Sequence, residues 1–304
     1  MLRAEGLTKR FGTRPAVEDL SFEVRAGEAV GFLGPNGAGK TTTMRLLTGF
    51  LPADAGRAEV FGVDAAEDPL AARRLLGYLP EDNPLYEELE VVETLHYAAR
   101  LRGLSDDAAR LARVKDALRR CGLKPVIGRR VWELSKGFRQ RLGLAQAIVH
   151  DPAALILDEP TSGLDPNQIA EVRGLISELK AKKTVLLSTH QLAEAEASCD
   201  RLVIVHQGRV VAQGAPAELR ARAARRALRV ALKAPPDEAR RALASLPGAA
   251  ACRDEIDAFV LESEGDADLR EAVFTLAAAR HWPILSLTEE RATLEALFKE
   301  LTRS

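Results

Sequence analysis

Apolar and polar positions alternate along the first 25 residues, with Leu2 and Ala4 near the start of this stretch and Leu20 and Val24 near its end. A period of two is typical of a strand that buries one face and exposes the other. The pattern therefore predicts two antiparallel strands joined by a turn at Gly12–Pro15, where glycine and proline interrupt the alternation.

Beyond this stretch, short apolar runs alternate with segments of helical periodicity. The predicted strands cover 29–33, 56–63, 153–157 and 184–187, and the predicted helices cover 41–47, 70–76, 91–121, 166–181 and 191–198. A hairpin over 202–212, turning at Gln207–Gly208, follows them. Strands that alternate with helices predict a mainly parallel α/β sheet with an antiparallel edge.

The composition then changes, because alanine and arginine dominate residues 218–227, as in a linker helix. Residues 228–304 predict the order β-α-β-β-α-β-α, with the last helix over 293–301, which resembles a ferredoxin-like α+β domain. We therefore expect a large α/β domain over 1–217, with a helical subdomain at about 82–150, and a small accessory domain after the linker.

Composition narrows the class of protein. The 304 residues include 43 basic and 44 acidic ones, and the resulting net charge of −1 gives no electrostatic reason to expect nucleic acid as a partner. No apolar run reaches the ~18 residues of a membrane helix, and the first residues lack the apolar core of a signal peptide. Cys121, Cys199 and Cys252 have no metal-ligand spacing, so we expect free thiols in a cytoplasmic protein that would need a partner at a membrane.

The segment Gly34–Thr41 matches the pattern G-x-x-x-x-G-K-[ST] at every position. It lies between a predicted buried strand and a predicted helix, so its backbone N–H groups can surround phosphate oxygens at the helix N-terminus. Lys40 can reach the β- and γ-phosphates, and the Thr41 hydroxyl can ligate Mg²⁺. A glycine-rich turn with a chance lysine rarely produces so complete a motif, which therefore predicts binding of a nucleoside triphosphate.

Two carboxylates, Asp158 and Glu159, follow the apolar strand at 153–157. Because ligands of α/β sheets bind at the carboxyl ends of the strands, Asp158 is predicted to hold Mg²⁺ through water. The negative charge of Asp158 should raise the pKa of Glu159 and suit that residue to act as a general base on water. The alternative is that Asp158 and Glu159 are acidic residues without a functional role at the end of a strand. The phosphate-binding motif argues against this alternative.

Further short motifs surround these carboxylates. Leu134–Arg141 precedes the strand, Thr161–Pro166 follows Glu159, and Leu187–His190 ends the next strand. Each motif alone is weak evidence, since Ser135 could simply cap a helix and a histidine at a strand end is often structural. Their occurrence together, in this order and at this spacing, argues against coincidence.

The combined motifs resemble the nucleotide-binding subunit of ATP-binding-cassette (ABC) transporters, over residues 1 to about 217. The resemblance implies a P-loop NTPase fold with a mixed RecA-like core, an antiparallel β subdomain and an α-helical subdomain, and it implies ATP and Mg²⁺ as ligands. The residues that it implies for ATP are Phe11 against the adenine, then Gly34, Pro35, Asn36, Gly37, Ala38, Gly39, Lys40, Thr41 and Thr42, and Ser135, Gly137 and Asp165. For Phe11, an apolar residue on an edge strand remains the alternative.

The resemblance also implies Lys40, Glu159 and His190 as catalytic residues, and Thr41, Glu81 and Asp158 as metal ligands. The sequence departs from the family pattern twice. Glu81 stands where the family usually has glutamine, and the usual Leu-Ser-Gly-Gly-Gln reads Leu-Ser-Lys-Gly-Phe. Since Ser135 and Gly137 are retained, we expect ATP hydrolysis to survive these changes.

Three segments, 78–86, 134–141 and 157–168, are similar to bacterial ATPases of the gliding-motility, antibiotic and sodium exporter type. That group pairs with a separate multi-helix permease, which chooses the substrate. The resemblance implies a homodimer that sandwiches two ATP–Mg²⁺, peripheral on the cytoplasmic face of the inner membrane. The main alternative is a soluble non-transport ABC ATPase acting on DNA or ribosomes, and a P-loop kinase or GTPase is a third interpretation.

Overall fold

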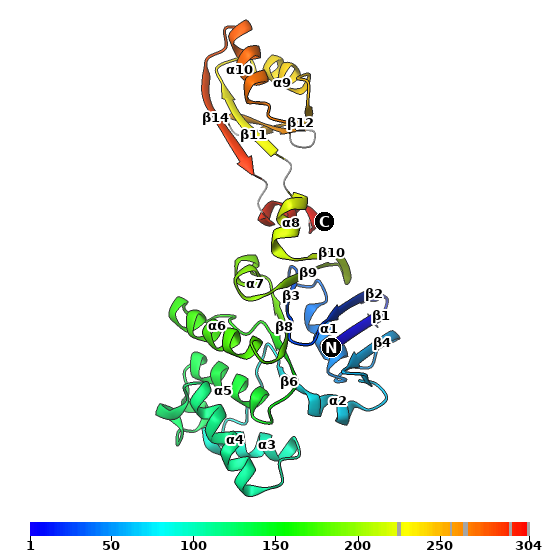
Figure 1. The fold of residues 1–304 in the computed structure, drawn as a ribbon, viewed down its shortest axis with the longest axis vertical. Helices are drawn as coiled ribbons and strands as arrows, with labels where there is room; N and C mark the ends of the chain where they lie inside the picture. The colour runs from blue at the N-terminus through cyan, green and yellow to red at the C-terminus, as the bar shows by residue number, and fades with distance from the viewer. Residues whose placement is uncertain (224–225, 256, 264–266, 292–293, 303–304) are drawn as a thin grey trace. The chain divides into compact units, whose positions relative to one another are not determined.

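The computed structural model describes residues 1–223, 226–255, 257–263, 267–291 and 294–302 (Figure 1). The chain divides into two compact units, Met1–Ala215 and Pro216–Arg303. The described residues predicted as a linker fall in helix α8 (Pro216–Ala223) and at the start of strand β11 (Arg226–Leu232), both in the second unit. No helix in the described part of the chain is long and apolar enough to cross a membrane.

A six-stranded sheet forms the centre of the first unit (Figure 1). Its strands in spatial order are β10 (Arg209–Gly214), β9 (Arg201–His206), β3 (Ala29–Leu33), β8 (Thr184–Thr189), β7 (Ala154–Asp158) and β6 (Leu76–Leu79). All neighbouring pairs are parallel except β9 and β10, which form the hairpin expected at Gln207–Gly208. Every residue of β3, β7 and β8 is buried, as in sheets covered on both faces. The predicted mainly parallel sheet with an antiparallel edge is confirmed.

An antiparallel sheet packs beside it in the order β2 (Arg14–Val24), β1 (Leu2–Phe11), β4 (Ala55–Val60) and β5 (Val63–Asp64). The two N-terminal strands pair as predicted. The prediction of one strand over 56–63 was wrong, because Phe61 and Gly62 adopt φ values of +49° and +83° and turn the chain back on itself. Apolar residues of this sheet share one core with helix α1 (Lys40–Leu47) and β3.

Helices make up the rest of the first unit. They are α2 (Pro69–Leu75), α3 (Val91–Leu101), α4 (Asp107–Arg120), α5 (Lys136–Ile148), α6 (Pro166–Lys180) and α7 (Leu192–Ser198), with short 3₁₀ turns at Lys124–Val126 and Val131–Glu133. The sequence interpretation missed β6, whose first residue, Leu76, was placed in the preceding helix. A Cβ on Gly77 would lie 2.1 Å from the Ala147 carbonyl oxygen, so this strand depends on a close approach to α5.

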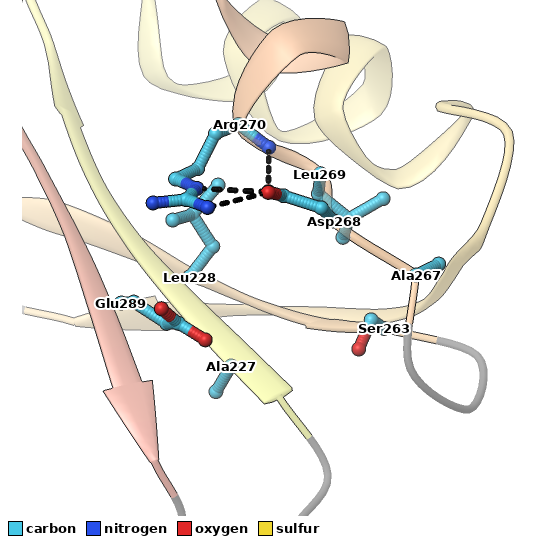
Figure 2. A pocket seen from close by; sticks show the side chains of 8 residues that line it. All are labelled: Ala227, Leu228, Ser263, Ala267, Asp268, Leu269, Arg270 and Glu289. Carbon is cyan, nitrogen blue, oxygen red and sulfur yellow. Dashed lines mark hydrogen bonds and ion pairs between the residues drawn. The ribbon is translucent and has the colours of Figure 1, made fainter.

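After α8, the second unit continues with β11, α9 (Pro236–Ala244), β12 (Ala249–Glu255), β13 (Ala258–Ser263), α10 (Arg270–Ala279), β14 (Ile284–Arg291) and α11 (Leu294–Leu301). Its strands lie in the order β12-β13-β11-β14 and pair antiparallel throughout. Thr293, the predicted start of the last helix, lies outside the described residues. Figure 2 shows a small pocket of this unit, where Arg270 pairs with Asp268 at 2.5 Å. Its volume of about 10 Å³ has room for roughly one water molecule.

Candidate functional site

The loop between β3 and α1 is shaped by glycines. Gly37 and Gly39 adopt φ values of +81° and +97°, and a Cβ on Gly39 would lie 2.4 Å from the Ala16 carbonyl oxygen. Gly34 is equally constrained, since its Cβ would lie 2.5 Å from the Val205 carbonyl oxygen. Helix α1 has no side-chain cap and no acidic residue in its first turn, so its own residues supply no negative charge at its N-terminus. The loop therefore offers backbone N–H groups and a helix dipole to an anion.

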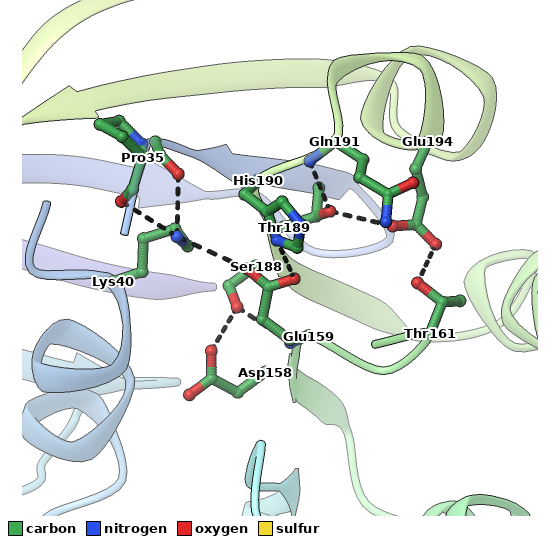
Figure 3. Close-up of polar contacts among 11 residues, drawn as sticks. Pro35, Lys40, Asp158, Glu159, Thr161, Ser188, Thr189, His190, Gln191 and Glu194 are labelled. Carbon is green, nitrogen blue, oxygen red and sulfur yellow. Dashed lines mark hydrogen bonds and ion pairs between the residues drawn. The ribbon is translucent and has the colours of Figure 1, made fainter. Parts of the chain in front are cut away.

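Lys40 is held inside this loop, with only 7% of the residue exposed. Its ammonium donates to the carbonyl oxygens of Gly34 at 2.8 Å and Pro35 at 3.3 Å, and it lies 3.5 Å from Oε1 of Glu159 (Figure 3). The charge is thus compensated by the protein itself, as a buried ammonium requires. A phosphate group entering the loop would offer the same ammonium a stronger, charge-assisted partner.

A cavity of about 410 Å³ opens in front of Lys40. Its lining residues are Phe11, Ala16, Asn36, Gly37, Gly39, Lys40, Thr41, Thr42, Glu81 and Glu159. The sequence interpretation named all of these except Ala16, whose part in the site comes from its backbone beside Gly39. Phe11 is 57% exposed at the end of β1 and so presents an open aromatic face to the cavity. Ala38 does not line the cavity but is buried in the core beneath the loop.

Asp158 ends strand β7 and is fully buried. The Ser188 hydroxyl, on the neighbouring strand β8, donates to Oδ1 of Asp158 (Figure 3). The other carboxylate oxygen, Oδ2, is buried and has no hydrogen-bond partner among the described residues. An uncompensated carboxylate oxygen in the interior is costly, so this atom fits a bound cation. Ser188 lies within the predicted motif Leu187–His190, but the sequence interpretation gave it no role in the site.

Glu159 is 5% exposed and has an unusual backbone, with φ at +48°. Its N–H donates to both the carbonyl oxygen and the hydroxyl of Ser188, at 3.2 and 3.1 Å, which holds this conformation in place. Oε2 of Glu159 lies 2.8 Å from Nδ1 of His190. The strand ends thus bring together the three residues predicted to be catalytic.

Burial raises the pKa of Glu159 above its ordinary value, while Lys40 and His190 partly oppose this shift. The predicted direction is confirmed. The predicted cause was wrong, because loss of solvent, rather than the charge of Asp158, produces the shift. A carboxylate with raised proton affinity is better suited to take a proton from water.

Three further predicted residues lie outside this cavity. The Ser135 hydroxyl accepts from the Phe138 N–H at 3.4 Å and so caps α5, and a Cβ on Gly137 would lie 2.6 Å from Oε1 of Gln168. Asp165 caps α6 by accepting from two backbone N–H groups, each at 3.0 Å. Within one chain, these residues therefore do not contribute to the cavity around Lys40.

The phosphate loop on a mainly parallel sheet, with buried carboxylates at the adjacent strand end, defines a P-loop nucleoside-triphosphatase. A family model described as "ABC transporter" matches residues 17–162. The Nod factor export ATP-binding protein I of Burkholderia lata is 44% identical over 209 residues, which are 68% of each chain. The chain belongs to the ABC transporter ATP-binding family and is an ATP-binding ATPase of that family.

Solved structures agree with this assignment. A structure described as an ATP binding subunit of an ABC transporter superposes with a TM-score of 0.67 at 36% identity, covering 73% of this chain and 92% of that one. The dimeric structure of MJ0796, a bacterial ABC transporter cassette, has a TM-score of 0.65 at 22% identity, covering 71% and 98%. At that identity, the second likeness shows the fold alone.

Proposed function

We propose that this chain is the ATP-hydrolysing subunit of a bacterial ABC exporter, acting as a homodimer on a separate multi-helix permease. The observation that carries the proposal is the convergence of Lys40, Glu159 and His190 beside the glycine loop, with distances of 3.5 and 2.8 Å between neighbouring groups. In this proposal the cavity takes ATP, with Phe11 against the adenine and residues 34–42 around the phosphates.

Each polar group then has a separate task. Lys40 exchanges its carbonyl partners for the β- and γ-phosphates, which places positive charge where negative charge develops. Glu159 orients the attacking water and takes its proton at the carboxylate, which its raised pKa favours. The Nδ1 atom of His190 contacts Oε2 of Glu159, so the other ring nitrogen, Nε2, is available to the γ-phosphate.

Asp158, with Thr41 and Glu81, would hold Mg²⁺. The buried Oδ2 atom of Asp158 without a hydrogen-bond partner supports this assignment. When bound, Mg²⁺ would neutralise the charge of the phosphates. Glu81 is exposed at the cavity rim and has no N–H to donate, so it would act through its carboxylate, where glutamine would act through an amide.

Ser135, Gly137 and Asp165 complete the site only in a dimer. They lie outside the cavity of their own chain, and we assign them to the ATP bound by the partner chain. The dimeric MJ0796 cassette supports this arrangement by its fold. ATP that contacts both subunits favours the closed dimer, and hydrolysis removes that difference in affinity.

An exposed apolar group in the helical part of the first unit is the proposed permease contact. Tyr86, Tyr97, Leu101 and Trp132 are 42–68% exposed, and the rings of Tyr86 and Tyr97 meet edge to face at 5.5 Å. Exposed aromatic clusters are typical of protein interfaces. This contact would hold the protein on the cytoplasmic face of the inner membrane. The printed name of the Burkholderia relative supports export as the direction.

The second unit is proposed to be a ferredoxin-like domain over 228–304, supported by its strand order β12-β13-β11-β14 and its antiparallel pairing. We retain 218–227 as the connection between the domains. The roles proposed for this domain are regulation, a dimer contact or simple stabilisation of the chain.

Gentle solubilisation of membranes from cells with the tagged native chain, followed by identification of co-purifying proteins, tests the exporter proposal. A stoichiometric polytopic membrane protein supports it, and Tyr86→Ala should reduce that recovery while sparing ATPase activity. Phe274→Ala, an equally exposed aromatic of the second unit, is the matched control. Recovery only with ribosomes, with DNA or alone would favour the non-transport class of ABC ATPase.

A further inference from the structure

Glu194 is an acidic residue that no family motif marks, on helix α7 behind the site. It is 1% exposed, and both carboxylate oxygens are engaged (Figure 3). Oε1 accepts from the Thr161 hydroxyl at 2.5 Å, and Oε2 accepts from the Thr189 hydroxyl at 2.9 Å. The Nε atom of Arg173 also lies 4.0 Å from Oε1. A carboxylate is retained in the interior only when such partners compensate its desolvation.

The two threonines belong to the two segments that carry the proposed catalytic pair. Thr161 lies two residues after Glu159, and Thr189 directly precedes His190. The Thr189 hydroxyl also accepts from the Gln191 N–H at 3.0 Å, so hydrogen bonds hold the backbone on both sides of His190. The buried carboxylate of Glu194 therefore links the segment after Glu159 to the segment around His190.

The hydrogen bonds of Glu194 should stabilise the contact between Nδ1 of His190 and Oε2 of Glu159, which lie 2.8 Å apart. The His190 side chain is 44% exposed, so packing alone does not fix its place. Misplacement of a reacting group by about 1 Å can reduce a rate by about 100-fold. The loop around His190 thus needs an anchor, and Glu194 is placed to supply it.

We propose that Glu194 is a positioning residue for ATP hydrolysis, holding Thr161 and Thr189 so that His190 stays on Glu159. This inference rests on the proposed roles of Glu159 and His190. Glu194 is not among the residues that line the cavity and is not part of the phosphate loop, so its loss should affect the rate of hydrolysis and leave nucleotide binding intact.

The test compares Glu194→Ala with Glu194→Gln in the full chain, by steady-state ATPase kinetics and by binding of the fluorescent analogue TNP-ATP. Glutamine can accept from one threonine and donate to the other, whereas alanine can do neither. We expect Glu194→Ala to lower kcat by about 10- to 100-fold with an unchanged TNP-ATP Kd, and Glu194→Gln to recover most of the rate. Thr161→Val removes one hydroxyl and should give a smaller fall in kcat, again with an unchanged TNP-ATP Kd. This variant replaces Glu194→Ala in the test if Glu194→Ala does not fold.

Leu179→Ala is the stability control, because Leu179 is fully buried on α6 and makes none of these hydrogen bonds. It should lower Tm and preserve kcat. Wild-type kcat in Glu194→Ala, equal loss in the alanine and glutamine variants, or a parallel loss of TNP-ATP binding would each overturn the positioning role. If Glu159→Gln and His190→Ala also keep full activity, the proposed site itself is wrong, and this outcome is distinguishable from failure at Glu194 alone.

Discussion

The two units of the chain differ in whether they bury charged side chains. In the first unit, Lys40, Asp158, Glu159 and Glu194 are each at most 7% exposed and meet around one cavity or directly behind it. In the described part of the second unit, no charged side chain is buried to that extent, and Ser263 is the buried polar residue there. Burial of a charged side chain costs free energy. A cluster of buried charged residues therefore indicates a functional site.

The second unit instead has an apolar core under a charged surface. Leu228, Val230 and Leu261 are buried in that core, and its described ion pairs lie outside it. One example, Arg229 with Glu255 at 3.1 Å, joins side chains that are 42% and 49% exposed. Pairs of this kind contribute only ~0–1 kcal/mol, so this unit should respond to changes in packing and hardly to changes in charge.

The largest expected effect tests the buried charges. Glu159→Gln keeps the shape of the side chain and removes its capacity to take a proton, so kcat should fall by roughly 10²–10⁴ while ATP still binds. Steady-state ATPase assays measure the rate, and gel filtration with ATP should reveal a trapped dimer. A variant with wild-type turnover would remove Glu159 from its assigned role.

The next effect concerns packing in the second unit. Leu261→Ala deletes a fully buried side chain and should cost about 2–5 kcal/mol of that unit's free energy of unfolding, with ATPase activity nearly unchanged. Trp132 and Trp282 are the two tryptophans of the chain, one in each unit, so Trp132→Phe leaves a fluorescence signal from the second unit alone. Equal loss of ATPase activity would show that the units are not independent.

A pH effect should be confined to the first unit. Burial lowers the pKa of His150 from 6.5 to about 4, and the nearby Arg102 adds to the shift. Because the unfolded state binds the proton more tightly, the stabilisation is complete above pH 6.5 and is lost as the pH falls through 4. The loss is about 3 kcal/mol, and His150→Gln should reduce it. Urea unfolding between pH 7 and about 4, followed by Trp132 fluorescence in a Trp282→Phe background, measures this loss. The same dependence of unfolding free energy on pH in His150→Gln would contradict this account.

The smallest effect is expected for the exposed ion pair between Arg229 and Glu255. Arg229→Ala should change the stability of the second unit by less than about 1 kcal/mol and leave ATP hydrolysis unaltered. Thermal unfolding followed by Trp282 fluorescence provides the measurement. A larger loss would mean that exposed charges of this unit matter more than their solvent exposure indicates.

The phosphate loop, the hairpins β1–β2 and β9–β10 and the family could all be predicted from the amino-acid sequence. These features depend on consecutive residues: a strand, a glycine turn and a helix stand next to one another at 29–47, and Gln207–Gly208 lies between its two strands. Backbone conformations that favour glycine and the periods of strand and helix can be read locally. The same locality explains why the cavity residues of the phosphate loop could be predicted, whereas Phe11 and Glu81 were predicted from the resemblance to the family.

The residues that hold the site in place could not be predicted, because they come from distant parts of the sequence. Ser188 meets Asp158 across 30 positions of sequence because β7 and β8 pair in register, and Glu194 meets Thr161 across 33. Strand β6 exists beside α5 because Gly77 permits the approach, and burial rather than a neighbouring charge raises the pKa of Glu159. Such contacts and burial depend on which distant segments pack together, and no local pattern of residues specifies that.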